Sequence, residues 1–451
     1  MTERMKAVSA AGAVAAFWLA VWVLVAALVA QPLILPGPGA VVAALLRLVC
    51  AVGTWAILAG SGVRILGGLA LAAVCGGLLA RISVRSRAFA RLAAPALSFM
   101  KATPVACVVV LLLIWLGSAR VSIAAVFLMA LPGVYFSLVE GLAQVDKPLE
   151  QMFRLHGVRG WRLFCAHTWR EVLPFVLSCA RAVIGMSWKA GVAAELIGMA
   201  AGTVGERIYQ AKLLIETADL LAWTVLVVAA SWACERVLVW LLRASGPVAW
   251  GAAVRAHGHG LRGRARAAGD GAAAELALAV GDRAPWAPAL DGLVLRVPAG
   301  GRTCVMGASG VGKSTLLALA AGECAPCSMV FQDVRLVEDV SALDNVLVCA
   351  DARVDTSSAA ALLRLLLPGV DVHARVTELS GGQRRRVEIA RALLCPGDAV
   401  ILDEPFTGLD TAARDACAEV VLDLLDGRML LLATHDAADA QALDISDIIT
   451  L

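Results

Sequence analysis

Charged and aromatic side chains are scarce in this chain of 451 residues, at 17% and 5%, whereas 60% of its residues are hydrophobic. With a mean hydropathy of +0.80, the composition excludes an ordinary soluble protein. A regular cysteine spacing is also missing. The twelve cysteines are scattered, and several lie inside apolar runs, where they act as small hydrophobic residues. The sequence therefore excludes a disulfide scaffold.

The apolar excess lies before about residue 245 and has the lengths of membrane spans. Residues 8–30 are almost uncharged and long enough to cross a hydrocarbon core, which takes about 20 helical residues. This run is too long for a signal peptide, and more spans follow. We expect them at 60–80, 93–116, 121–139, 172–198 and 220–242, with a further helix over 40–52 in the interface or against the bundle. Residues 1–243 are thus predicted to be an all-α polytopic membrane domain of about six transmembrane helices.

Basic residues mark which side of the membrane faces the cytoplasm. The second and fourth connections and the segment after the last span are rich in arginine, and they lie on the same side as Arg4 and Lys6. The opposite side has fewer and more dispersed basic residues, at Arg47, Arg120, Arg207 and Lys212. We therefore expect a multi-pass protein of the cytoplasmic membrane whose C-terminal half is cytosolic.

Residues 244–272 form a predicted linker that is rich in Gly, Ala and Arg. Such a segment cannot bury enough apolar area to fold alone, and its arginines suit anionic lipid. It has no interleaved aromatic residues for base stacking, so no nucleic acid is expected as a partner. His257 and His259 are better explained as solvated side chains than as metal ligands.

The C-terminal half contains a complete P-loop, G-x-x-x-x-G-K-[ST], at Gly307, Ala308, Ser309, Gly310, Val311, Gly312, Lys313 and Ser314, followed by Thr315. A short apolar strand precedes it and a helix follows, which is the context that the motif requires. Backbone N–H groups of the glycine-rich turn surround phosphate oxygens. Lys313 reaches the terminal phosphates and Ser314 ligates Mg²⁺, so ATP and Mg²⁺ are the expected ligands.

Further polar residues follow in an order typical of nucleotide hydrolysis. Gln332 ends an apolar strand and is expected at the metal, and Asp403 ends another strand and is expected in the Mg²⁺ shell. Glu404 polarises the attacking water, and His435 contacts the terminal phosphate. The helix N-terminus at Ser380, Gly381, Gly382 and Gln383, with Ser380 as its cap, is expected to bind phosphate. Asp410 is a further expected nucleotide-binding residue.

Together these motifs resemble the nucleotide-binding domain of an ATP-binding cassette transporter, an α/β P-loop ATPase, over residues 273–451. The signature Leu379–Gln383 is the specific element, because other P-loop ATPases do not contain it. The resemblance implies that two such domains meet head to tail, with the P-loop of one and the signature of the other on the same ATP. It therefore implies a homodimer. It also implies an aromatic residue under the adenine, for which Trp286 is the candidate, although Trp286 equally fits a loop-packing role.

The membrane half resembles a permease of the binding-protein-dependent importers, of the nitrate, aliphatic sulfonate and taurine type. The likeness rests on Ala102-Thr-Pro-Val, Trp115-Leu-Gly, Glu140-Gly-Leu-Ala-Gln-Val-Asp, Leu173-Pro174 and the segment from Trp188 to Glu195. Residues 141–171 match the family's coupling loop, which implies short helices seated in a groove of the ATPase. The resemblance also implies a separate extracytoplasmic solute-binding protein.

Two features depart from this family. Lys313 and Gln332 are unusually close in sequence, so the antiparallel strands between them are expected to be mostly lost and the cassette trimmed. Inside this short stretch, Cys324 and Cys327 form a single C-x-x-C. Without a second pair they are better explained as incidental thiols than as a redox pair or half a zinc site.

Three charged residues, Arg181, Lys189 and Glu195, fall within the predicted fifth span. Charges in a span usually face the bundle interior or an aqueous path, so Arg181 or Lys189 could attract an anionic solute. A structural ion pair or snorkelling toward a helix end explains them equally well. Lys101 is a weaker candidate.

The function expected from this resemblance is ATP-driven import of a small solute, anionic or like sulfonate, nitrate or taurine, by a homodimer of fused permease–ATPase chains. The alternatives are an ABC-type exporter or lipid translocator with the same ATPase, and a membrane regulator with a weakened ATPase.

Overall fold

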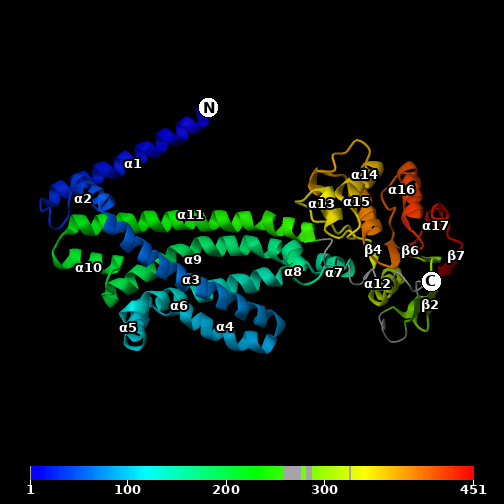
Figure 1. Ribbon diagram of the computed structural model, residues 1–451, viewed down its shortest axis with the longest axis horizontal. Helices are drawn as coiled ribbons and strands as arrows, with labels where there is room; N and C mark the ends of the chain where they lie inside the picture. The colour runs from blue at the N-terminus through cyan, green and yellow to red at the C-terminus, as the bar shows by residue number, and fades with distance from the viewer. Residues whose placement is uncertain (1, 257–275, 281–286, 325–326) are drawn as a thin grey trace. The chain divides into compact units, whose positions relative to one another are not determined.

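The computed structural model describes residues 2–256, 276–280, 287–324 and 327–451. It divides into two compact units (Figure 1). The first contains the chain up to Gln144 together with Val172–Ala244, and the second contains Val145–Glu171 together with Ser245–Leu451. The fourth connection therefore packs with the C-terminal part of the chain and not with the helices that flank it.

The first unit is entirely helical in its described residues. Its helices are α1 (Thr2–Val29), α2 (Pro38–Cys50), α3 (Val52–Arg85), α4 (Arg87–Ala102), α5 (Val105–Leu116), α6 (Ser118–Ala143), α9 (Trp169–Gly198), α10 (Val204–Leu213) and α11 (Thr217–Arg255). Among the described residues, five helices are long and apolar enough to cross a membrane, or six if α4 and α5 count as one span. This confirms the prediction of a polytopic domain with about six spans. α11 continues to Arg255, so residues 244–255 are helical, and the rest of the predicted linker lies outside the described residues from 257 on.

The span expected over 93–116 consists of two helices and not of one. The chain breaks between Ala102 and Val105, and α4 and α5 meet at an angle of 102°. The physical cause is Pro104, which has no N–H to donate and which forces Thr103 into an extended conformation with ψ 126°. The Thr103 hydroxyl donates a hydrogen bond to the Phe99 carbonyl at 2.8 Å, which closes the end of α4.

Small residues let α3 and α6 approach closely. Gly68, Ala72, Gly76 and Ala80 recur every fourth residue along α3, and all four are buried. A Cβ atom at Gly68 would lie 2.5 Å from the Ile123 carbonyl oxygen of α6. Such stripes are how helices associate in lipid, where dispersion and not water expulsion drives packing.

The charged residues of the predicted fifth span differ in their surroundings. Glu195 on α9 is fully buried, accepting a hydrogen bond from the Ser61 hydroxyl at 2.8 Å and lying 3.4 Å from the Arg64 guanidinium of α3. Arg181 and Lys189 are exposed on the same helix. Glu195 is therefore part of a structural ion pair, whereas the Arg181 and Lys189 side chains are exposed on the surface of this unit.

The second unit is built on a five-stranded parallel sheet with the order β4-β5-β6-β3-β7. Its strands are β3 (Arg302–Met306), β4 (Ser328–Val330), β5 (Ala399–Asp403), β6 (Met429–Thr434) and β7 (Asp447–Thr450). β5 and β6 are buried along their whole length, as expected for parallel strands covered on both faces. The carboxyl ends of β3, β4, β5 and β6 lie at one edge, and every predicted phosphate or metal ligand outside the signature follows one of them.

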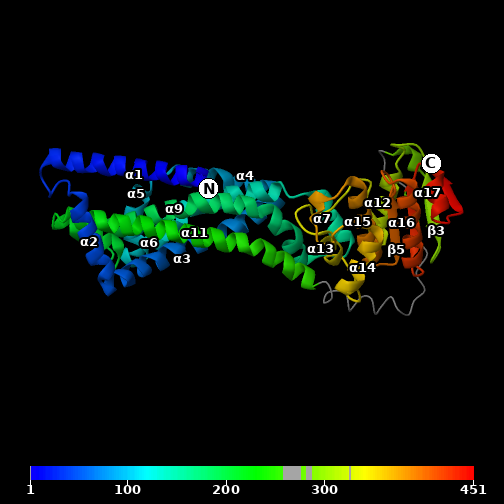
Figure 2. The same ribbon diagram turned by 90° about the horizontal axis from the view of Figure 1, so that it is seen from above.

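Helices cover both faces of this sheet (Figure 2). α12 (Lys313–Glu323) packs on one face, against alternate residues such as Val305 and Ile401. α13 (Ala342–Leu347), α14 (Thr356–Leu366), α15 (Gly381–Leu394) and α16 (Thr411–Leu424) share a hydrophobic cluster with the residues of the other face. α17 (Ala437–Ala442) packs on β6 and α16. The α/β fold predicted for the C-terminal half is confirmed.

Antiparallel structure is reduced, as predicted. In the described part of the second unit, the only antiparallel sheet pairs β1 (Leu276–Ala279) with β2 (Val294–Val297). Between the end of α12 at Glu323 and the start of β4 at Ser328, the described residues Cys324 and Cys327 belong to no strand.

The fourth connection contributes three short helical segments to this unit: α7 (Lys147–Leu155), α8 (Gly160–Leu163) and a π-helical turn at Phe164–Thr168. Asp146 caps α7 by accepting a hydrogen bond from the Leu149 amide at 3.1 Å. The buried face of α7, formed by Leu149, Met152 and Phe153, belongs to the same hydrophobic cluster as the α12 face of the sheet. We call residues 145–171 the coupling segment.

Candidate functional site

The P-loop joins β3 to α12 by a turn that only glycine tolerates at two positions. Gly310 and Gly312 have φ values of +82° and +113°, which L side chains rarely adopt. The buried Lys313 side chain turns back into the loop, where its ammonium donates to the carbonyl oxygens of Gly307 at 2.7 Å and Ala308 at 3.0 Å. The residues from Ala308 to Gly310 are exposed. An ammonium group and exposed turn amides thus converge at the N-terminus of α12, the arrangement that suits phosphate.

The three residues predicted to hold Mg²⁺ come from three different elements and meet at the same sheet edge. The Ser314 hydroxyl lies 3.5 Å from the Gln332 side-chain oxygen. Asp403 is buried at the end of β5, and its Oδ1 has no hydrogen-bond partner. Burial raises the pKa of Asp403, a hydrogen bond from Ser314 opposes the rise, and the charge of Glu404 adds to it. A buried carboxylate oxygen without a partner, beside two further oxygen ligands, fits a hard divalent cation.

Glu404 directly follows this strand in a strained conformation. Its φ is +47°, and its amide donates to the Ala433 carbonyl of β6 at 2.8 Å, so the turn is fixed to the neighbouring strand. Its carboxylate lies 3.4 Å from Nδ1 of His435, the residue after β6, and also accepts from the Thr407 hydroxyl at 3.5 Å. Two of the three residues predicted to be catalytic, Glu404 and His435, are thus in contact, with Glu404 mostly buried and His435 exposed; the third is Gln332.

The signature forms the N-terminus of α15. Ser380 caps this helix as predicted, and together with Gln383 it forms a reciprocal capping box. Ser380 and Gly381 are exposed. Across the described residues, no hydrogen bond or ion pair joins 379–383 to 307–315. The structure therefore brings the P-loop, Gln332, Asp403, Glu404 and His435 together but leaves the signature apart from them.

One predicted residue, Asp410, stands outside this cluster. Asp410 caps α16, where its carboxylate accepts a hydrogen bond from the Ala413 amide at 2.8 Å. Trp286, the candidate for the adenine, lies outside the described residues.

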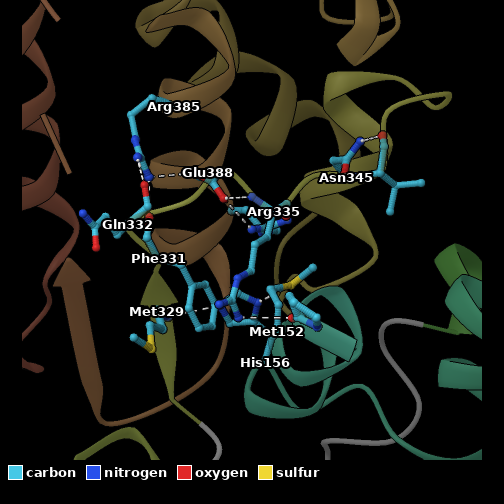
Figure 3. Close-up of polar contacts among 12 residues, drawn as sticks. Met152, His156, Met329, Phe331, Gln332, Arg335, Asn345, Arg385 and Glu388 are labelled. Atoms are coloured by element: carbon cyan, nitrogen blue, oxygen red, sulfur yellow. Dashed lines mark hydrogen bonds and ion pairs between the residues drawn. The ribbon is translucent and has the colours of Figure 1, made fainter. Parts of the chain in front are cut away.

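A buried cluster of charges beneath the site was not predicted (Figure 3). Glu388 of α15 is fully buried and lies 3.0 Å from the Arg385 guanidinium and 3.4 Å from that of Arg391. Burial raises the pKa of Glu388, and the charges of Arg391 and Arg385 oppose the rise. Arg385 also donates to the main-chain carbonyls of Phe331 and Gln332, so it fixes the backbone of Gln332, one of the predicted metal ligands.

Arg335 connects this cluster to the coupling segment. Its amide donates to the Glu388 carboxylate at 2.6 Å, its guanidinium lies 3.6 Å from the centre of the Phe331 ring, and it donates to the Pro148 carbonyl of α7 at 3.1 Å. In Figure 3 the Arg335 side chain runs past Phe331 toward the helix that carries Met152 and His156. A continuous path of polar contacts therefore links Gln332 to α7.

Other contacts hold the coupling segment along the same surface. The Met329 amide donates to His156 Nε2 at 3.1 Å, and the Cys327 amide donates to the Leu155 carbonyl at 3.1 Å. Arg162 donates to the Val348 carbonyl at 2.9 Å, and Arg170 pairs with Asp339. The resemblance implied contact between residues 141–171 and the ATPase, and the structure has such contacts for 145–171.

Two family descriptions match the chain. Residues 68–247 match the binding-protein-dependent transport system inner membrane component, and residues 290–407 match the ABC transporter. The thiamine import ATP-binding protein ThiQ of Jannaschia sp. is 35% identical over 178 residues, which is 33% of this chain and 77% of that protein. The aliphatic sulfonates import ATP-binding protein SsuB of Corynebacterium glutamicum is 36% identical, with 34% and 70% covered.

A sulfonates import ATP-binding protein of Rhizobium johnstonii, SsuB 1, is 35% identical over 34% of this chain, and the chain spans 64% of its length. Among solved structures, a dimeric bacterial ABC transporter cassette is similar at 25% identity and a TM-score of 0.33, over 36% of this chain and 86% of that one. The chain therefore belongs to the ATP-binding cassette transporters, with a permease of the binding-protein-dependent type and an ABC ATPase in one polypeptide.

Proposed function

We propose that this chain imports a small solute across the cytoplasmic membrane at the expense of ATP, as a homodimer that works with a separate extracytoplasmic binding protein. The observation that carries this proposal is the path of contacts from Gln332 to α7. A cassette that works without a membrane domain has no use for such a path, whereas an ATPase that moves a permease requires one.

Hydrolysis is assigned to the sheet edge. Lys313 and the P-loop amides bind the phosphates, and Ser314, Gln332 and Asp403 would hold Mg²⁺, which neutralises charge on the β- and γ-phosphate oxygens. Glu404 orients water and accepts its proton as the water oxygen attacks the γ-phosphorus and the bond to the β-phosphate oxygen breaks. His435, 3.4 Å from Glu404, orients that carboxylate and faces the γ-phosphate.

The separation of signature and P-loop supports the homodimer. Within the described part of one chain, no hydrogen bond or ion pair joins the exposed Ser380 end of α15 to the P-loop, so this end is available to a second copy. Asp410 caps α16 and so fixes the first turn of that helix. In this proposal Asp410 belongs to the dimer surface.

Coupling uses the charged cluster. When nucleotide and metal draw in Gln332, the movement reaches Arg385 through two carbonyls, then Glu388, Arg335 and finally Pro148 of α7. Charge-assisted hydrogen bonds are short and directional, so they transmit displacement better than apolar contacts do. Because nucleotide favours the closed cassette, its binding then shifts the permease toward the conformation that is coupled to the closed cassette.

The proposed solute is small and is either anionic or like sulfonate, nitrate or taurine. The relatives include importers of aliphatic sulfonates, and the chain exposes Arg181 and Lys189 on α9. Another relative imports thiamine, a cation, which the same two residues would disfavour. A regulator with a weakened ATPase remains the second candidate, favoured by the reduced antiparallel structure between α12 and β4.

The test is ATP turnover and uptake by the reconstituted chain in proteoliposomes, with and without the binding protein encoded beside it. Import requires turnover that rises with the loaded binding protein and uptake of its solute. Efflux of lipid or solute without a binding protein would instead support export. Nucleotide binding without turnover under any condition would support the regulator.

A further inference from the structure

The described residues contain one group of side chains with the composition of a soft metal site, away from the phosphate ligands. His156, Cys349 and Cys395 are all buried, and one ligand atom from each lies within 4.8 Å of the others. They come from three elements: His156 follows α7, Cys349 follows α13, and Cys395 follows α15.

The surroundings add a further soft ligand and a cation. The Met152 sulfur lies 3.0 Å from His156 Nδ1, one helical turn earlier on α7. The Arg162 guanidinium is near enough to both cysteines to interact with their charge, and its Nε is buried without a hydrogen-bond partner. The thiolate is the form that binds metal, and the guanidinium offers it a counter-charge. Burial and the neighbouring Cys349 raise the pKa of Cys395, so the metal has to displace that proton.

We propose that His156, Cys349 and Cys395 bind a soft or borderline metal ion of the Zn²⁺ class, which fastens the coupling segment to the ATPase. One imidazole nitrogen and two thiolates are the ligand set typical of Zn²⁺, with Met152 as a fourth candidate donor for a softer ion such as Cu⁺. Because His156 belongs to the coupling segment and both cysteines belong to the cassette, the ion would bridge them. The proposal is independent of the transported solute and of import itself.

Two contacts oppose the site. The Cys395 thiol donates a hydrogen bond to the Cys349 carbonyl at 3.2 Å, and a metal-bound thiolate would lose it. His156 Nε2 already accepts a hydrogen bond from the Met329 amide, and a metal at that nitrogen would leave the amide unpaired. The cost of one unmet buried N–H is small beside the binding free energy of a metal–thiolate set. Coordination through Nδ1 avoids this cost and displaces only the contact with the Met152 sulfur.

The experiment is a Co²⁺ titration of the purified full chain in detergent, reduced and free of oxygen. Co²⁺ bound by thiolates gives charge-transfer absorption and the visible bands of a tetrahedral ion, and Zn²⁺ should displace it. We expect one equivalent per chain. Cys349→Ser or Cys395→Ser should lower the charge-transfer intensity by about half, since one of two thiolates remains, and His156→Asn should weaken binding.

Two matched variants decide between this site and the other thiols. Cys417→Ser removes a buried cysteine elsewhere in the cassette, and Cys324→Ser removes half of the C-x-x-C; both should leave the spectrum unchanged. The thermal unfolding midpoint without metal shows whether each variant is folded. The proposal is overturned if the wild-type chain gives no thiolate band, or if the band survives Cys349→Ser and disappears in Cys324→Ser.

Discussion

Replacing Glu388 by glutamine tests the charged cluster most directly, because the change removes a charge and almost no volume. In the native chain this carboxylate faces two guanidinium groups, those of Arg385 and Arg391, which are 5% and 1% exposed. Glutamine leaves both cations buried without a counter-charge. Breaking a buried ion pair from one side typically costs about 3–5 kcal/mol.

A surface pair supplies the control. Glu338 lies 3.9 Å from Arg384, and its side chain is 70% exposed, so Glu338→Gln should cost only about 0–1 kcal/mol. For a domain of this size, 1 kcal/mol shifts the unfolding midpoint by about 2–4 °C, so Glu388→Gln should lower it by about 6–20 °C. A thiol-reactive fluorophore can follow unfolding of the full chain, because Cys304 and Cys417 are buried in the cassette.

Equal midpoints for the two variants would refute the reasoning. They would mean that the carboxylate charge of Glu388 does not stabilise the two buried guanidinium groups. The path from Gln332 to α7 would then not depend on that charge and would have to be rebuilt from neutral hydrogen bonds.

Three further predictions concern the metal ligands, the coupling contact and the membrane helices. Asp403→Asn should weaken Mg²⁺ binding about 10- to 100-fold. In the wild type, Mg²⁺ affinity should fall as the pH drops, at pH values above the titration range of an ordinary Asp, because protonated Asp403 does not ligate the metal. Mg²⁺ titrations of ATP turnover at several pH values measure both effects. Arg335→Gln should keep basal turnover and lose its stimulation by the binding protein, whereas Arg353→Gln, on the exposed face, should keep both; proteoliposome assays that leave Arg335→Gln fully stimulated contradict the path. Gly68→Leu should destabilise the membrane unit by about 1–3 kcal/mol, whereas a Cβ at Gly67 meets nothing within 4 Å and Gly67→Leu should not; thermal unfolding in detergent separates the two.

The nucleotide site could be predicted from the sequence because each of its ligands is adjacent to a strong local signal. Gln332, Asp403 and His435 each follow an apolar run, and such runs become parallel strands whose carboxyl ends meet at one edge. The P-loop glycines predict positive φ, and the structure has it at Gly310 and Gly312. At this site the positions predicted from local sequence patterns agree with those that the folded sheet gives to the residues.

The sequence predicted neither the bend in the third span nor the charged cluster. The apolar run over 93–116 conceals the break at Thr103 and Pro104, since hydropathy averages over the window and ignores the missing amide. Arg385 and Arg391 look like surface residues of a basic helix, because arginine is rarely buried without a partner. The available signal was Glu388, a single acid between two arginines at helical spacing i,i+3.

The phosphate ligands and the antiparallel strands belong to different parts of the cassette. Lys313, Asp403 and Glu404 are fixed by β3, β5 and β6, which pair with one another and are covered by helices on both faces. β1 and β2 form a separate sheet, and the short stretch from α12 to β4 has no strand among its described residues. The phosphate ligands therefore keep their support whatever strands the stretch from α12 to β4 lacks, and in the function proposed above the reduction would weaken nucleotide binding before it affects the hydrolytic residues.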